Sequence, residues 1–148
     1  MNRWAQRHRN VLESVLDQGE RLLAADRVLL TSAAAVDLAG ARAGRSQRLG
    51  GRRGHAALRA ARAHGIDLPR SAFVLAVTDR RLLVWRATTL LARPGAFATS
   101  IPRHRVVSLS ASGRFGFARL RLLLDDGTLF LLRPYGGRRL EHLADRPR

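Results

Sequence analysis

Two short apolar runs separated by four polar residues constrain the fold of this chain most strongly. Phe73–Val77 and Leu82–Trp85 are the apolar runs, and residues 78–81 separate them. Phe, Val and Trp favour a pleated, half-buried surface, and a four-residue polar break is the right length for a hairpin turn. Residues on both faces of the first run are apolar, so we expect both faces to be covered. The sequence therefore predicts a central β-hairpin in a sheet that curls around a core.

More strands are predicted towards the C-terminus. Residues 119–124 carry leucine at every second position, which gives that run one firmly apolar face. The Asp126-Gly127 dipeptide that follows is a strong turn signal, and residues 128–132 return as a strand. Two further runs are predicted to be strands, Phe97–Ile101 and Val106–Ser110. Residues 21–30 fit either a strand or a short helix, because their periodicity favours neither.

The N-terminal residues 1–18 are predicted to contain an amphipathic helix. Trp4, Val11, Leu12 and Val15 fall on one stripe at helical spacing. Such a helix packs its stripe against the sheet, or else lies on a membrane surface with Trp4 at the interface. A second, shorter helix is predicted over residues 138–145, where Leu140 and Leu143 are spaced to point inward.

Length and cysteine content limit the class of protein. With 148 residues we expect one domain, spanning 1–148, with a core of its own. The chain has no cysteine, which excludes disulfides and thiolate metal ligands and is typical of a reducing cytoplasm. No stretch approaches the roughly 20 apolar residues that cross a bilayer, and residues 1–9 lack the apolar core of a signal peptide. We therefore expect a cytoplasmic protein, with the inner face of the membrane as an alternative location.

Charge is the strongest compositional feature. The chain has 27 basic residues, all arginine, against 11 acidic ones, giving a formal net charge of +16. A high proportion of G and C in the coding DNA would explain arginine in place of lysine, but not the shortage of Asp and Glu. An excess this large predicts an anionic partner: a membrane surface, a nucleic acid or an acidic protein.

Residues 38–66 carry seven arginines and no acid between Leu38 and Ile66. The first part, residues 40–54, is rich in Gly and Arg with almost nothing to bury, so we expect a loop. The alanine-rich residues 55–64 predict a short helix that ends at Gly65. A loop of this length in a compact domain is either a tolerated, solvated insertion or an electrostatic arm that binds phosphates.

The central hairpin also carries a family resemblance. The run Val-Thr-Asp-Arg-Arg-Leu-Leu-Val at 77–84 resembles the hairpin of bacterial pleckstrin-homology-like and GRAM-type domains. The later segments 100–102, 106–109, 120–124 and 126–132 follow in an order similar to that family's, so the resemblance covers roughly 70–134. Gln18-Gly19-Glu20-Arg21 is similar to the turn before the family's first strand, which implies a strand at 21–30.

The resemblance implies an α+β fold: a small pleckstrin-homology-like β-barrel of about six or seven antiparallel strands, with the N-terminal amphipathic helix and a short C-terminal helix. The main barrel strands would lie within 70–134. In that fold, basic residues on the first strands and their loops meet phosphoinositide head groups. Family members are diverse in what they bind, so the resemblance implies a binding module rather than one particular ligand.

No catalytic or metal-binding pattern is present in the sequence. The five histidines are scattered, and there is no HExxH motif, no GxSxG motif and no P-loop. We therefore expect a protein that is not an enzyme, with no catalytic residues, no metal and no cofactor. Aromatic residues are few, and most lie in predicted strands, where core packing is the default; Phe115, Phe117 and Tyr135 are the exceptions.

The function predicted from the sequence is a binding or adaptor module for an anionic membrane surface or a protein partner. A non-specific nucleic-acid binder is the second prediction, because Arg/Gly-rich loops bind phosphates without reading sequence. A structural oligomerisation module is the third. The candidate anion-binding residues lie in the basic loop and at predicted turns, where the arginines at 80–81 have the alternative role of closing the turn. They are Arg42, Arg45, Arg48, Arg52, Arg53, Arg80, Arg81, Arg103 and Arg105.

Overall fold

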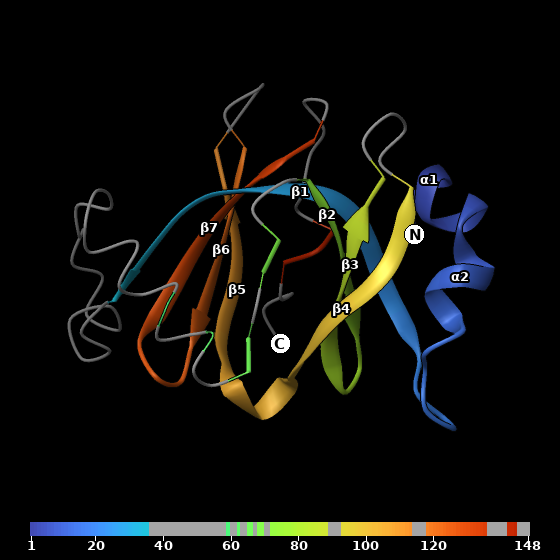
Figure 1. The fold of residues 1–148 in the computed structure, drawn as a ribbon, viewed down its shortest axis with the longest axis horizontal. Helices are drawn as coiled ribbons and strands as arrows, with labels where there is room; N and C mark the ends of the chain where they lie inside the picture. Colours follow the sequence, from blue (N-terminus) through green and yellow to red (C-terminus); the bar gives the residue numbers. More distant parts are fainter. Residues whose placement is uncertain are drawn as a thin grey trace.

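The computed structural model describes residues 1–35, 59, 62, 65–66, 68–69, 72–88, 93–113, 118–135 and 142–144 (Figure 1). The predicted basic loop at 40–54 lies outside these residues, together with its five candidate arginines. Arg59 and Arg62 have helical conformation, and the rest of the predicted helix 55–64 also lies outside the described residues. Gly65, predicted to end that helix, has a left-handed φ of 80° and donates its N–H to the Arg62 carbonyl at 3.0 Å.

Seven antiparallel strands form one sheet in the described part of the chain. They are β1 (Leu22–Ala35), β2 (Phe73–Thr78), β3 (Arg81–Ala87), β4 (Pro94–Pro102), β5 (Val106–Ser112), β6 (Arg119–Leu124) and β7 (Thr128–Pro134). Their spatial order is β4-β3-β2-β1-β7-β6-β5. Both predicted hairpins are confirmed, since β2 pairs with β3 and β6 pairs with β7. The Pro94-Gly95 dipeptide, which is typical of a turn, begins β4.

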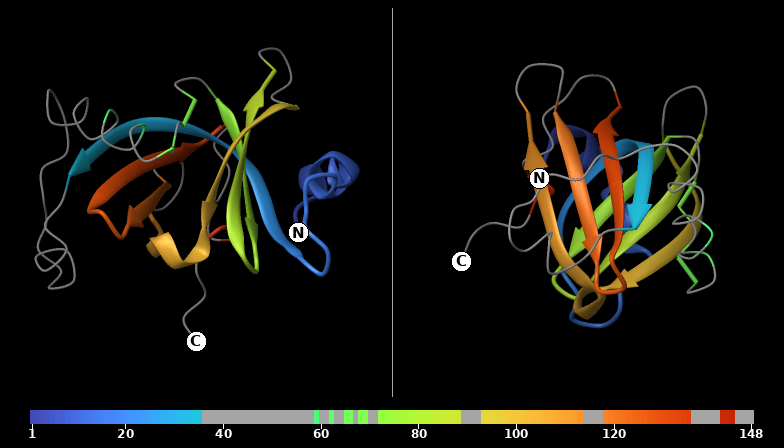
Figure 2. Two further views of the ribbon diagram at one scale, coloured as in Figure 1. Left: turned by 60° about the horizontal axis from the view of Figure 1, so that its bottom comes forward. Right: turned by 90° about the vertical axis from the view of Figure 1, so that its left-hand side faces the viewer.

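The long strand β1 is shared by the two halves of the sheet. Its residues 22–28 pair with β2, and its residues 28–35 pair with β7. The register shifts between Leu30 and Ser32, which is the kind of irregularity that bends a strand. Figure 2 shows the result: the β6–β7 half runs in a different direction from the β2–β4 half. The ambiguous residues 21–30 therefore belong to a strand, as the family resemblance implied.

The sheet curls but does not close into a barrel. β4 and β5 are the two ends of its strand order, and only the 3-10 turn η1 (Arg103–Arg105) joins them. Ile66, Leu68 and Leu143 are buried in the core that the two halves enclose, so segments distant in sequence contribute to it. The predicted closed barrel is thus replaced, among the described residues, by an open curled sheet whose interior is completed by other segments.

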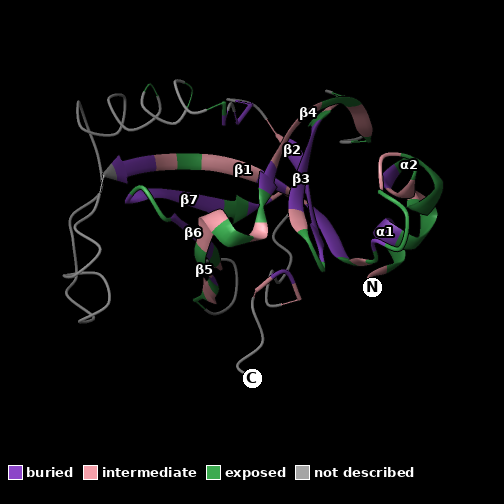
Figure 3. Ribbon diagram, turned by 90° about the horizontal axis from the view of Figure 1, so that it is seen from below, coloured by how far each residue is buried: buried purple, intermediate pink, exposed green. Residues whose placement is uncertain are grey.

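Each face of the central hairpin is buried against a different partner. Phe73, Leu75 and Val77 join the interior core, whereas Val74 and Ala76 join a second core on the outer face. Every residue of β2 is buried, as Figure 3 shows. The prediction that both faces of this hairpin are covered is therefore confirmed.

Two short helices, rather than one helix within 1–18, cover the outer face of the hairpin. They are α1 (Arg3–Arg7) and α2 (Arg9–Glu13). The side chain of Asn2 caps α1, because the Ala5 N–H donates to its Oδ1 at 2.7 Å. The chain breaks at His8, whose φ of −105° and ψ of 12° are not helical.

The apolar stripe predicted for this region is only partly correct. Trp4 and Leu12 are buried against the sheet in the outer core, whereas Val11 is 43% exposed. The packing alternative for the helix is therefore the one the structure shows. Trp4 at 8% exposure is not available to insert into a membrane interface.

The C-terminal helix predicted at 138–145 is not present at the residues that are described there. Residues 142–144 form a turn, and the rest of that segment lies outside the described residues. Leu143 nevertheless points inward as expected, with 1% exposure. Neither described helix approaches the length needed to cross a membrane, since each has five residues.

We predict that Leu12→Ala lowers the free energy of unfolding by about 2–5 kcal/mol, because Leu12 is fully buried between α2 and the sheet. Val11→Ala is the matched control, because Val11 is the neighbouring residue and is largely exposed. This substitution should change the free energy of unfolding by less than about 0.5 kcal/mol. Urea denaturation of both variants measures the difference. Equal losses would contradict the assignment of the buried helix face.

Candidate anion-binding surface

Turns and chain ends define two opposite ends of the sheet. The lower end comprises residues 17–21, residues 79–81 at the tip of the β2–β3 hairpin, η1 and the turn at 125–127. The upper end comprises the ends of β3, β5 and β7, the starts of β4 and β6, and α1. These ends lie along the lower and upper edges of Figure 1. The arginines at the two ends have different electrostatic surroundings, and this difference locates the candidate site.

A buried carboxylate organises the lower end. The side chain of Glu20 is fully buried and accepts hydrogen bonds from Arg81 Nε at 3.0 Å and Nη2 at 2.9 Å. Thr78 Oγ1 also donates to Glu20, at 2.6 Å, and accepts from the Arg81 N–H at 2.9 Å. The hydrogen bonds from Arg81 lower the pKa of Glu20 from an ordinary 4.5 to about 2. They outweigh burial, which alone would raise this pKa, and the hydrogen bonds from Thr78 and the Asp17 N–H lower it further. Arg81 therefore stabilises the hairpin, and its charge is compensated.

Other predicted turn arginines are brought together at the same end. The Arg103 N–H donates to the Arg80 carbonyl at 2.9 Å, which places η1 against the tip of the β2–β3 hairpin. Arg105 makes ion pairs with Asp125 at 3.3 Å and with Asp126 at 3.6 Å. The sequence prediction therefore identified four arginines that share one end of the fold, although it placed them in separate turns.

The lower end is electrically balanced. Its five described arginines are matched by five described carboxylates, so their formal charges cancel. The arginines are Arg21, Arg80, Arg81, Arg103 and Arg105, and the carboxylates are Asp17, Glu20, Asp79, Asp125 and Asp126. Five of the seven acidic residues that the structure describes are thus gathered here, and the net positive charge of the described chain must lie elsewhere.

An aromatic and cationic stack occupies the upper end. The guanidinium carbon of Arg27 lies 5.2 Å from the centre of the Trp4 ring and 5.7 Å from that of Tyr135. Both distances are within the range of a cation–π interaction. The ring of Trp4 in turn lies 4.9 Å from the ring of His8. This stack connects β1, the end of β7 and α1.

The surroundings of His8 are positively charged. Burial lowers the pKa of His8 below its ordinary value of 6.5, and the nearby charges of Arg93, Arg7 and Arg27 lower it further. Each of these arginines disfavours a second positive charge on the imidazole. Among the described residues, the carboxylate closest to this stack is Asp26, which is buried and 3.9 Å from Arg27.

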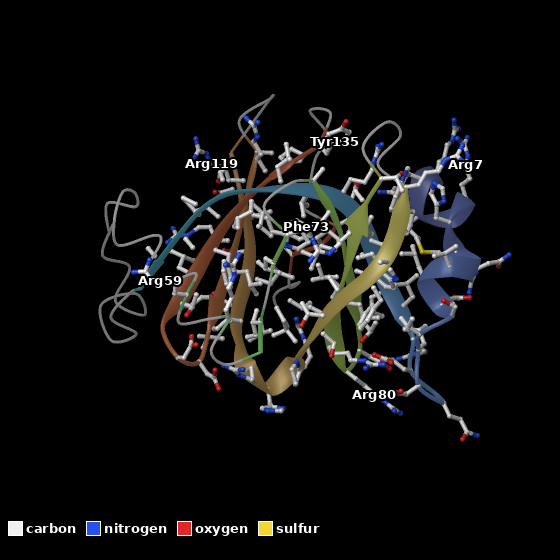
Figure 4. All side chains as sticks on the ribbon, viewed as in Figure 1. Arg7, Arg59, Phe73, Arg80, Arg119 and Tyr135 are labelled. Carbon is white, nitrogen blue, oxygen red and sulfur yellow. The ribbon has the colours of Figure 1, made fainter. Side chains whose placement is uncertain are left out.

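The outer face of β6 and β7 carries three more exposed arginines at the upper end. Leu120 and Leu122 point into the core, so Arg119 and Arg121 point outward. Leu132 likewise points inward and Arg133 outward. None of these three arginines makes an ion pair with a carboxylate that the structure describes. Figure 4 shows Arg119, Tyr135 and Arg7 along the upper edge of the molecule and Arg80 at the lower edge.

We give the name upper basic surface to five of the exposed arginines at this end that pair with no carboxylate among the described residues: Arg7, Arg93, Arg119, Arg121 and Arg133. Arg3 in α1 and Arg86 near the end of β3 have the same character. None of the five was among the predicted site residues. The alternation of arginine with leucine in 119–124 was a usable signal for two of them, because it already predicted an outward face. For Arg7 and Arg93, no local sequence pattern indicated that they belong to this surface.

The described residues contain no group of three or more His, Asp or Glu side chains that could hold a metal ion. Comparison with family models, curated proteins and solved structures found no match to this chain. The functional assignment therefore depends on the electrostatics and geometry of the surface itself.

We predict that Glu20→Gln destabilises the protein at pH 7 by about 2–4 kcal/mol, because it removes the charge that Arg81 requires. A carboxyl whose pKa falls on folding contributes stability above its unfolded pKa and loses it as the pH drops. The deficit should therefore be full above about pH 4.5 and shrink towards pH 2. Unfolding curves measured between pH 2 and pH 7 test this.

The matched control is Glu13→Gln, which removes the exposed ion pair between Glu13 and Arg9. The N–O distance in this pair is 2.7 Å. Exposed pairs of this kind contribute about 0.3–0.5 kcal/mol. A Glu20 variant as stable as the Glu13 variant at pH 7 would show that the buried network does not hold the lower end together.

Proposed function

We propose that this protein is a non-enzymatic binding module of pleckstrin-homology-like type that associates with an anionic membrane surface through the upper basic surface. The observation that carries the proposal is the segregation of charge: carboxylates compensate the arginines of the lower end, whereas the five arginines of the upper basic surface have no such partner among the described residues. The seven antiparallel strands support the family part of the proposal, since the resemblance implied six or seven.

A membrane surface fits these arginines better than a nucleic acid does. Non-specific binding of single strands combines basic grooves with aromatic rings on which bases stack. The outer face of β5, β6 and β7 presents arginine and serine, and the one aromatic residue within these three strands, Phe130, is fully buried. Tyr135, just after β7, is already engaged by Arg27. Phe115 and Phe117, the other aromatic candidates, lie outside the described residues.

The strength of the expected attachment follows from the number of charges. Each basic residue close to an anionic bilayer contributes about 1 kcal/mol. The five arginines of the upper basic surface would therefore supply about 5 kcal/mol, which gives weak attachment that salt screens. Trp4 contributes through the stack that positions α1, not by insertion into the bilayer.

We predict that Arg7→Gln with Arg93→Gln weakens binding to anionic vesicles about 30-fold, since two contributions of about 1 kcal/mol are lost. The matched control is Arg21→Gln with Arg80→Gln, which removes two exposed arginines from the balanced lower end. Both double variants lose two positive charges, so a difference between them reports location and not total charge. Liposome co-sedimentation at about 0.15 M salt is the measurement.

If the two double variants lose equal affinity for anionic vesicles, total charge and not the position of the arginines controls binding. That result would contradict the proposal. A greater loss in the lower-end variant would return the site to the turn arginines predicted from sequence. Duplex DNA at equal phosphate concentration should leave the protein on the vesicles. Complete removal by DNA would favour the nucleic-acid alternative.

A further inference from the structure

Arg119 and Arg133 occupy directly opposed positions on neighbouring strands. In the β6–β7 ladder Leu120 pairs with Leu132, and continuing the antiparallel register by one residue places Arg119 opposite Arg133. Both side chains are exposed and point to the outer face. Side chains opposed in this way have Cβ atoms about 4.5–5.5 Å apart, and like charges in such a pair are destabilising. None of the seven carboxylates that the structure describes forms an ion pair with Arg119 or Arg133.

Hydroxyl groups lie on the β5 side of the arginine pair. On β5, Ser112 is the register partner of Arg119 and Ser110 is the register partner of Arg121. Leu109 points into the core, so both serines share the outward face with the arginines, and both are exposed. The face therefore offers guanidinium forks and hydroxyl donors in two adjacent rows.

The exposed face has a clear boundary along the strands. Leu123, Leu129 and Leu131 have the same outward parity as the arginines but are all buried. Solvent access to this side of β6 and β7 is thus concentrated at the upper end, where the arginine pair lies. The pair is a local feature of the upper basic surface, and not part of an evenly charged sheet.

We propose that the Arg119–Arg133 pair, with Ser112 beside it, binds the phosphomonoester headgroup of an anionic membrane lipid. Two opposed guanidinium groups match a group that carries close to two negative charges and three acceptor oxygens, as a phosphomonoester does at neutral pH. A phosphodiester headgroup carries one charge and satisfies only one arginine. This inference rests on the proposed membrane association and adds a headgroup preference to it.

The test uses the full chain and vesicles of phosphatidylcholine doped with either phosphatidic acid, a phosphomonoester, or phosphatidylglycerol, a phosphodiester. The two compositions are matched in surface potential at pH 7.5, so that general electrostatic attraction is equal. The wild-type protein should prefer the phosphatidic acid vesicles about tenfold, as one additional charge-assisted contact predicts. Co-sedimentation isotherms at about 0.15 M salt measure the ratio.

Arg119→Gln with Arg133→Gln should abolish the preference, leaving equal binding to the two vesicle types. Arg7→Gln with Arg93→Gln is the matched control: it removes the same charge from the same upper basic surface, so it should weaken binding to both vesicles and keep their ratio. Thermal unfolding supplies a second readout. The Arg119/Arg133 variant should unfold at the same or a higher temperature, because it removes a repulsion.

Equal binding of the wild-type protein to both vesicle types would overturn the headgroup preference and leave the proposed membrane association intact. Absence of binding to either vesicle type would overturn the proposed function itself. If soluble glycerol 3-phosphate binds the arginine pair as tightly as the vesicles do, the ligand of the site is a soluble phosphomonoester. That result would overturn the assignment of a lipid to the site. A lowered unfolding temperature in the Arg119/Arg133 variant would show that the pair stabilises the fold, which contradicts the repulsion on which the inference depends.

Discussion

The two halves of the sheet are joined through the pairing of β1 with both of its neighbours, and the rest of the structure depends on that strand. Fourteen residues are enough to pair with β2 at one end and with β7 at the other. The shift in register after Leu30 lets the strand turn as it passes between them. Because one strand serves both halves, their inner faces enclose a common core that includes Val28 and Ala33 of β1 itself.

Distribution of the few carboxylates decides where positive charge is available. Glu20, Asp125 and their neighbours are used to hold turns together at the lower end, where Glu20 is buried and paired with Arg81. A buried carboxylate tolerates loss of solvent only when it is paired and hydrogen-bonded, so its arginine is committed to the fold. The arginines that remain for function are consequently those far from these turns. Fold stability and the proposed membrane association thus draw on different arginines of the same chain.

Local patterns were sufficient to predict the hairpins. Alternating leucines followed by Asp126-Gly127 produced β6, a tight turn and β7, with Gly127 at a left-handed φ of 85°. The N-terminal helix was predicted less well. Its apolar stripe placed both Val11 and Leu12 inward, but the backbone breaks at His8, and of these two residues of α2 only Leu12 is buried. Helical periodicity assumes an unbroken helix, and one non-helical residue is enough to invalidate it.

The sequence by itself determined the two hairpins, the two-sided burial of the central hairpin and the large excess of positive charge, because periodicity, turn residues and composition are local or additive properties. Only the tertiary structure decided which arginines are compensated. Glu20 and Arg81 are 61 residues apart in sequence and meet through strand pairing, and the Arg119–Arg133 opposition exists only in the register of β6 with β7. Electrostatic pairing depends on distance in space, and sequence separation does not measure that distance.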